Sequence, residues 1–249
     1  MVGSHHHRIT SLGRSSRNRP ALIAWWRDDA RTVPKAYRLT HRVIHASPIR
    51  TLIDILTPHI LDLPMPHVPI LPPAEAPKEV KAVYEEFHTR MSFPAPPNFI
   101  MTQGHSANVA RGTWEAVRNI LVLGEIPRWT KEMMFVAISK DRGCRYCTAA
   151  HIACCRMLGV TPEMLEGLVR DVNGLPDRRL RDMMLFALKC SRNPQSLTEG
   201  DFEQLRRHGL KQSEILEIIA MSALAVYANI IADATAMDQD EMFSTIGSP

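Results

Sequence analysis

Four side chains between residues 132 and 151 have types and spacing that suit redox chemistry. Glu132 is followed by Cys144 and Cys147 in a C-x-x-C pattern, and His151 comes one helical turn after Cys147. The thiolate is the reactive form of cysteine, and a helix N-terminus or a nearby histidine favours it. A histidine can take the thiol proton and return it to a leaving group, while a carboxylate orients the imidazole. The set therefore predicts a proton relay that ends in a redox-active cysteine pair.

Two helices joined at Gly143 would bring these side chains together. On a helix that begins near Cys144, positions i, i+3 and i+7 share a face, so Cys144, Cys147 and His151 form one stripe. Gly143 predicts a break between this helix and the helix-patterned run before it. If the chain folds back there as a helical hairpin, position 132 lies opposite about position 154. We therefore expect Glu132 to reach His151.

The pattern E-x11-C-x-x-C-x3-H resembles the alkylhydroperoxidase D family, within the carboxymuconolactone decarboxylase-like superfamily. The similarity extends over about residues 66–243, and its downstream part is most similar to the peroxidase-related branch. It includes the segments PILPPAEAPKEVKAVYEEF, GEIPRWTKEMMFVAISKDRGCRYCTAAH and LTEGDFEQLRRHGLKQSEILEIIAMSAL.

The resemblance implies a role for each site residue and a set of partners. Cys147 would attack the peroxide, Cys144 would resolve the oxidised cysteine, and Glu132 and His151 would move protons. A hydroperoxide substrate, an unidentified dithiol reductant and a homo-oligomer (trimer or hexamer) are expected, with no cofactor and no metal. Some relatives carry an additional relay histidine between the cysteines, where this chain has Tyr146. That difference leaves the identity of the substrate open.

Composition indicates a globular protein and excludes some functions. The 249 residues are 45% hydrophobic, and no uncharged apolar run approaches the ~20 residues of a membrane span. The net charge of +4 is uneven, because residues 1–64 hold ten Lys or Arg and four Asp, which gives +6, and the remainder sums to 4 − 6 = −2. A nearly neutral domain gives no indication of nucleic-acid or membrane binding. Five cysteines without a recognisable signal sequence favour a reducing compartment, the cytoplasm.

Residues 1–64 lack helical periodicity and are basic and rich in serine. We interpret them as a poorly structured extension that precedes a domain of residues 65–249. The Arg-rich start is compatible with an organelle-targeting peptide, but Asp28 and Asp29 weaken that interpretation.

The domain itself is expected to be an all-α helical bundle of the alkylhydroperoxidase D-like type, because no alternating β-branched run bounded by turns occurs. Capping and glycine signals place its helices. The expected helices are 75–91, a long one from Asn98 to Leu123, one capped by Thr130, one from Cys144 to Gly159, one from Thr161, 177–191, 199–208 and 213–237.

Other cysteines and histidines have simpler interpretations. Cysteine packs well in cores, and we assign Cys154, Cys155 and Cys190 to packing. Histidines at 88, 105 and 208 are expected to be structural or solvated. Glu132 alone would be an ordinary first-turn carboxylate.

Three classes of function remain for the set of four. The first is a thiol peroxidase, with a thiol-disulfide oxidoreductase as its close relative. The second is a metal site, in which Cys144, Cys147, His151 and Glu132 supply ligands, although no second C-x-x-C or H-x3-H pattern accompanies them. The third is a decarboxylase or a non-catalytic oligomer, which the cysteine pair argues against. The peroxidase is favoured.

Overall fold

The computed structural model describes residues 65–245, and every regular element in that range is helical. The extension 1–64 lies outside the described residues, so its predicted lack of structure stays a prediction. The all-α prediction is confirmed. The helices are α3 Lys78–Met91, α4 Asn98–Gln103, α5 Ala107–Ala116, π-helix η2 Val117–Val122, α6 Arg128–Asp141, α7 Arg145–Met157, α8 Pro162–Arg170, α9 Arg178–Arg192, α10 Glu199–Arg207, α11 Gln212–Ala234 and α12 Met242–Thr245, with short 3-10 turns η3 Val172–Gly174 and η4 Pro194–Ser196.

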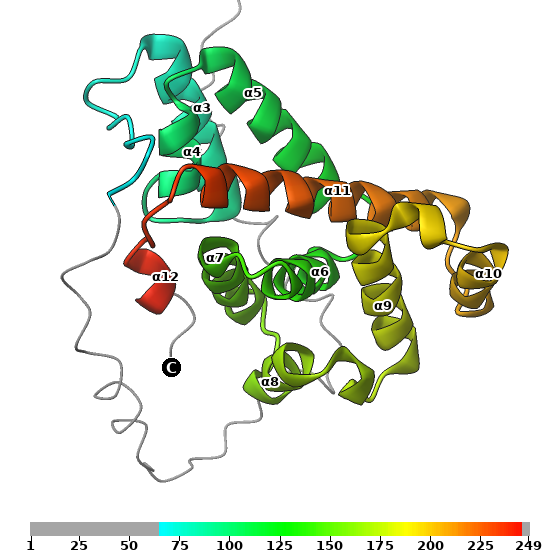
Figure 1. The fold of residues 1–249 in the computed structure, drawn as a ribbon. Coiled ribbons are helices and arrows are strands. Elements are labelled where there is room, and N and C mark those ends of the chain that lie inside the picture. The colour runs from blue at the N-terminus through cyan, green and yellow to red at the C-terminus, as the bar shows by residue number, and fades with distance from the viewer. Residues whose placement is uncertain (1–64, 246–249) are drawn as a thin grey trace, which may run out of the picture.

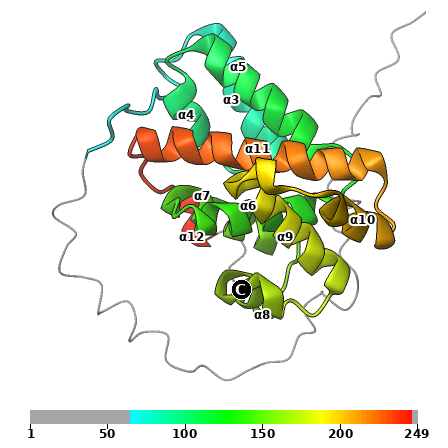
Figure 2. The same cartoon turned by 45° about the vertical axis from the view of Figure 1, so that its right-hand side comes forward.

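The long helix α11 is the axis of the fold. Figure 1 shows α3, α4 and α5 on one side of it, and α6, α7 and α9 on the other. The turned view keeps this arrangement, with α8 and α10 at the periphery (Figure 2). The hairpin of α6 and α7 therefore lies directly against α11, and the core runs through their shared interface.

α11 is also the described helix whose length and apolar composition would suffice to cross a membrane, which the sequence analysis did not anticipate. Half of its most apolar window is buried inside the protein. Core helices of globular proteins commonly have this composition, because a helix that packs on several sides is apolar around most of its circumference.

Three predicted helix starts are confirmed by side-chain caps. The Thr161 side chain accepts from the Met164 N–H, and Asp177 accepts from Leu180 N–H. Thr198 and Asp201 form a reciprocal capping box at the start of α10. These caps satisfy backbone donors that a helix N-terminus otherwise leaves unpaired.

The predicted helix from Asn98 to Leu123 is wrong, because the chain breaks into α4, α5 and η2. Gly104 lies against the ring of Tyr84, and a Cβ there would come within 1.8 Å of the Tyr84 hydroxyl. Ser106 then starts α5 by accepting from the Val109 N–H. The close approach of Tyr84 from α3 therefore requires glycine at position 104, where α4 ends, and local sequence cannot reveal that contact.

The start of α6 also differs from prediction. The helix begins at Arg128 after Pro127, so Thr130 is a buried first-turn residue and does not cap. Buried Lys131 holds this end in place, since its Nζ donates to the carbonyls of Ile120 (2.9 Å) and Leu123 (2.5 Å). The same ammonium lies 2.8 Å from a carboxylate oxygen of Glu217 on α11. Helix α6 is therefore fixed at its start as well as at the hairpin turn.

Candidate active site

The predicted hairpin between α6 and α7 is present. Gly143 has φ of +76°, a left-handed conformation that glycine adopts without strain. The Cys144 N–H donates to the Ser139 carbonyl at 2.9 Å, which closes the end of α6. Cys144 therefore occupies the N-cap position of α7, and Cys147 lies in its first turn.

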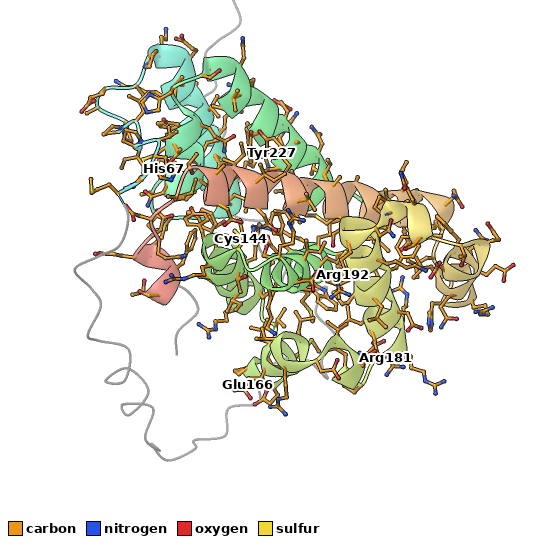
Figure 3. All side chains as sticks on the ribbon, in the orientation of Figure 1. His67, Cys144, Glu166, Arg181, Arg192 and Tyr227 are labelled. Carbon is orange, nitrogen blue, oxygen red and sulfur yellow. The ribbon has the colours of Figure 1, made fainter. Side chains whose placement is uncertain are left out.

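The two cysteines are adjacent, buried thiols. Cys144 is 0% exposed and Cys147 is 2% exposed. A hydrogen bond with the Cys147 side chain, together with burial and the nearby Asp233 carboxylate, raises the pKa of the Cys144 thiol far above its ordinary range. Cys144 thus stays protonated and interacts with Cys147 through its thiol (Figure 3 places it beside the C-terminal half of α11).

Glu132 reaches His151, as the hairpin predicted. The His151 Nδ1 lies 2.5 Å from the Glu132 Oε2, and the Glu132 side chain is 0% exposed. The imidazole also stacks on Phe135, with ring centroids 3.5 Å apart and an angle of 13° between the planes. Because Nδ1 is engaged by Glu132, Nε2 is the ring nitrogen left to exchange protons with a neighbour.

Arg128 is a site residue that the sequence analysis missed. Its Nε donates to the other Glu132 oxygen, Oε1, at 3.1 Å, and its side chain is 4% exposed. A second guanidinium nitrogen contacts the Met91 sulfur at 3.4 Å. The i,i+4 spacing from Arg128 to Glu132 was visible in the sequence, but such pairs are common on exposed helix faces. Burial of the pair depends on α3 and α7, which the spacing does not show.

Glu132 is kept ionised inside the protein. Burial pushes the pKa of its carboxyl upward, but His151 and Arg128 outweigh burial and hold that pKa below its usual range. The carboxylate thus bridges an imidazole and a guanidinium, and it can orient the imidazole at neutral pH.

Cys147 and His151 open onto a small apolar cavity of about 40 Å³. Its walls come from α3, α4, the loop between them, η2, α6, α7, α11 and α12, and include Phe87, Phe93, Phe99, Phe135, Leu224 and Phe243. A water-sized group needs ~10–15 Å³ of such space, so the cavity holds about three of them. Cys144 does not line this cavity.

The C-terminal segment closes one side of the cavity. The Tyr146 hydroxyl donates to Asp240 Oδ2 at 2.7 Å and accepts from the Phe99 N–H at 3.0 Å. Asp240 also accepts from the Asn98 N–H at 3.0 Å. Phe243 on α12 packs edge-on against Phe93, with centroids 5.5 Å apart. Tyr146, which stands between the two cysteines, therefore holds the C-terminal segment in place.

Cys154 lies closer to the site than its assigned packing role implied. Ligand atoms of Glu132, His151 and Cys154 fall within 4.8 Å of one another, a spacing that a metal ion could use. This cluster differs from the metal set considered above, because Cys154 stands in place of the C-x-x-C pair. Arg128 and His151 already occupy both Glu132 oxygens, and a cation would face the guanidinium. The donor set therefore suits ion pairing better than metal binding.

In the described part of the chain the remaining cysteines are buried, and Cys154 also lines the apolar cavity. Burial, followed by the Glu132 charge, raises the pKa of both Cys154 and Cys155 well above the ordinary value. Burial raises the pKa of Cys190 to about 11. The histidines bond to neighbours outside the cavity: His88 to Glu85, His105 to the Pro69 carbonyl and His208 to Asp182.

Comparison with known proteins identifies related sequences and folds. Residues 110–176 match the model of the carboxymuconolactone decarboxylase family. A comparison with curated proteins finds no match.

Solved structures share the fold over nearly their whole length. One is the alkylhydroperoxidase AhpD core of an uncharacterized peroxidase-related protein from Ralstonia eutropha JMP134, with 26% identity, a TM-score of 0.68, and coverage of 74% of this chain and 97% of that one. A peroxidase-related protein from Silicibacter sp. TM1040 has 26% identity and a TM-score of 0.67, with coverage of 76% and 100%. The debrominase Bmp8, solved with 2,3,4-tribromopyrrole, has 20% identity, a TM-score of 0.64, and coverage of 74% and 97%.

Proposed function

Because the chain belongs to the alkylhydroperoxidase D-like group of the carboxymuconolactone decarboxylase superfamily, we propose that it is a thiol-dependent peroxidase. Cys147 is the attacking thiol, Cys144 the resolving thiol, and Glu132 and His151 the proton relay. Members of this superfamily are enzymes, but the fold also carries other chemistry, as the debrominase neighbour illustrates. The proposed activity therefore rests on the site.

One observation carries the proposal: the 2.5 Å contact between Glu132 and His151 lies beside a cavity that His151 shares with Cys147. An imidazole held through Nδ1 has Nε2 available to take a thiol proton one helical turn away. The second thiol, Cys144, is near Cys147, and this interaction is the main cause of its raised pKa. Base, nucleophile and resolving group are thus contiguous.

In the oxidative half-reaction, the Cys147 thiolate attacks a peroxide oxygen and the O–O bond breaks. The leaving alkoxide takes the proton that His151 removed from Cys147, so an alcohol departs and Cys147 becomes a sulfenic acid. Cys144 then attacks that sulfur, and the S–O bond breaks. The hydroxide departs as water with the Cys144 proton, which leaves a Cys144–Cys147 disulfide.

The cavity supports an organic hydroperoxide as substrate. Its walls are almost wholly aromatic or aliphatic, so an apolar substituent is desolvated there while the peroxide group meets Cys147 and His151. Its small volume favours a compact substituent. We expect a small alkyl hydroperoxide, such as methyl hydroperoxide, to be consumed faster than the bulky cumene hydroperoxide.

The test is peroxide consumption with a dithiol donor. The wild-type protein should consume peroxide catalytically, and Cys147→Ser should consume it no faster than a reaction without enzyme. Cys190→Ser is the matched control, since Cys190 lies on α9 and does not line the cavity. Mass spectrometry after mild oxidation should show the loss of two hydrogens at Cys144 and Cys147. Equal activity of Cys147→Ser and wild type would refute the proposal.

The protein is further proposed to act as a homo-oligomer in a reducing compartment such as the cytoplasm. α11 supports the first part, because side chains on its outer face are apolar and exposed, including Leu216 (65%) and Ile230 (53%). Buried thiols without a disulfide among the described cysteines are consistent with the second. Residues 65–249 would form the whole catalytic domain.

A further inference from the structure

The two cysteines of the pair are adjacent to different hollows. Cys147 lines the apolar cavity described above. A separate polar groove of about 270 Å³ lies between the start of α7 and the chain that leaves α11. Gly143 and Arg145, the two chain neighbours of Cys144, line this groove. Tyr146 lies between the two hollows and contributes to both.

Cys144 adjoins the groove through its two chain neighbours, Gly143 and Arg145. Asp233 also lines the groove, and its carboxylate is one of the groups that raise the pKa of the Cys144 thiol. A Cβ placed on Gly143 would meet no atom within 4 Å, so the backbone next to Cys144 borders open space. The groove therefore reaches the chain on both sides of Cys144, although the thiol itself is buried.

Thiol–disulfide exchange favours attack at Cys144. An incoming thiolate approaches along the S–S axis, from the side away from the leaving sulfur, and the exchange is faster when the leaving thiol is the more acidic one. Expelled Cys147 emerges beside His151, which can return a proton to it. Expelled Cys144 would emerge beside the Asp233 carboxylate, where like charge disfavours a thiolate. The position of the groove and the preference for Cys147 as the leaving thiol thus both favour attack at the Cys144 sulfur.

We propose that the groove lined by Gly143, Arg145 and Asp233 is the docking site for the thiol reductant, which attacks the Cys144 sulfur. The inference rests on the proposed peroxidase function and extends it: peroxide enters by the apolar cavity to Cys147, and reductant enters by the groove to Cys144. The two half-reactions therefore use separate entrances to one disulfide.

The reductive step balances with a dithiol as co-reactant. Its first thiolate forms a bond to the Cys144 sulfur, the Cys144–Cys147 bond breaks, and Cys147 leaves as a thiolate that takes a proton. The second thiolate of the reductant attacks its partner sulfur in the mixed disulfide. The reductant departs as a cyclic disulfide, Cys144 takes a proton, and the protein has gained two electrons and two protons.

Charge on the groove defines the class of reductant. Asp233 and Asp238 contribute two carboxylates and Arg145 one guanidinium, so the groove carries a net formal charge of −1. An uncharged dithiol is therefore favoured over an anionic one, most clearly at low ionic strength.

The decisive experiment identifies which sulfur is attacked. Protein oxidised with diamide is mixed briefly with 2-mercaptoethanol, quenched with acid, alkylated and digested with trypsin. Cleavage after Arg145 separates Cys144 from Cys147, and fragmentation distinguishes Cys147 from Cys154 and Cys155. We expect the mercaptoethanol adduct on Cys144 and the alkyl group on Cys147. The reverse pattern overturns the proposal.

A second measurement tests the groove itself. Reduction of the diamide-formed disulfide is timed with 2,3-dimercaptopropanol and with its anionic counterpart, 2,3-dimercaptopropanesulfonate. The uncharged dithiol should react several-fold faster per thiolate, and Asp238→Asn should narrow that ratio by raising the rate of the anionic probe. Glu166→Gln, which removes an exposed carboxylate on α8 that lines neither hollow, should leave both rates unchanged. A ratio that does not change in Asp238→Asn, or that changes as much in Glu166→Gln, would contradict the groove as the entrance.

These assays do not require peroxide turnover. If the protein fails to consume peroxide but mercaptoethanol still adds to Cys144, the peroxidase proposal fails while the groove assignment stands. If peroxide is consumed and the adduct forms on Cys147, the peroxidase proposal stands and the groove assignment fails.

Discussion

The Arg128 Nε lies 3.1 Å from the Glu132 Oε1, and both side chains are withdrawn from solvent. A buried carboxylate with a single neutral partner would favour its protonated form. With Arg128 on one oxygen and His151 on the other, the pKa of Glu132 stays below its usual range despite burial. Arg128 therefore positions the relay by keeping Glu132 charged, although Arg128 does not line the cavity.

Replacing Arg128 with Gln should destabilise the protein by about 3–5 kcal/mol at pH 7, because the Glu132 carboxylate stays buried without its charged partner. The pKa of Glu132 is lower in the folded protein than in the unfolded chain. The ionised carboxylate therefore contributes to folding stability above the unfolded pKa, and this contribution is lost as the pH falls through the folded-state pKa. In Arg128→Gln the loss of stability on acidification should begin at higher pH, because the pKa of Glu132 is lowered less when Arg128 is absent.

Urea unfolding at pH 7 and at pH 4–5 measures both effects. Arg207→Gln is the control, since Arg207 forms an exposed i,i+4 pair with Glu203, and it should change stability by less than about 1 kcal/mol. If both variants lowered the free energy of unfolding equally at pH 7, the Arg128–Glu132 pair would contribute no more to stability than a surface ion pair.

The relay should behave as one unit in thiol reactivity. His151→Gln should slow alkylation of Cys147 at neutral pH, and raising the pH should restore the rate, because hydroxide then removes the proton. Glu132→Gln should act in the same direction by less, since the imidazole survives without its orienting charge. The double variant should be little slower than His151→Gln alone, as expected when one group acts through another.

Rates of alkylation at the Cys147 peptide against pH, for the four proteins, test this. His208→Gln is the control, because His208 pairs with Asp182 outside the cavity. Simple addition of the two single effects would mean that Glu132 acts on Cys147 independently of His151.

How far the site could be predicted depends on how local each signal is. Gly143 and the C-x-x-C spacing encode the hairpin within about twenty residues, and the Glu132–His151 contact followed from them. Tyr146 and Asp240 are 94 positions apart, and nothing in the sequence near either residue indicates the contact. Position 104 requires glycine because Tyr84, from another element, fills the space that a Cβ would take. Side-chain packing between distant elements decided each of the missed features.

The Tyr146–Asp240 contact predicts opposite effects for two conservative changes. Burial raises the pKa of the Asp240 carboxyl, and the Tyr146 hydroxyl and the Asn98 N–H only partly offset it. A raised folded pKa means that stability is full at low pH and falls as pH rises through that value. Tyr146→Phe removes a donor from this carboxylate and should cost about 1–3 kcal/mol at pH 7, and less at pH 4. Asp240→Asn keeps an acceptor without the charge, and should be neutral or stabilising at pH 7.

Urea unfolding at the two pH values, with limited proteolysis of the C-terminal segment, measures this. Tyr227→Phe is a control for loss of a tyrosine hydroxyl, because that hydroxyl bonds to Thr113 at 2.7 Å on the other side of the fold. A cost for Asp240→Asn at pH 7 as large as that of Tyr146→Phe would mean that the carboxylate charge itself is needed.

The outer face of α11 should mediate assembly. Leu216, Ala223, Tyr227 and Ile230 follow one another at spacings of seven, four and three, so they lie on one stripe of the helix, and all are exposed. A second copy packed on this stripe would bury it, which stabilises association by about 25 cal/mol per Å² of apolar surface. Placing a charge there should oppose that burial without disturbing the fold, because the position is already solvated in the single chain.

We therefore expect Ile230→Lys to lower the mass measured by light scattering or sedimentation, with the melting temperature of the dissociated chain nearly unchanged. Glu166→Lys is the control, since Glu166 is exposed on α8, away from α11 (Figure 3), and it should keep the wild-type mass. The inner face of α11 contributes Leu224 and Ala228 to the apolar cavity, so dissociation should also slow peroxide consumption by loosening that wall. If Ile230→Lys assembles as the wild type does, or if the wild type is a monomer, this face is not the subunit interface.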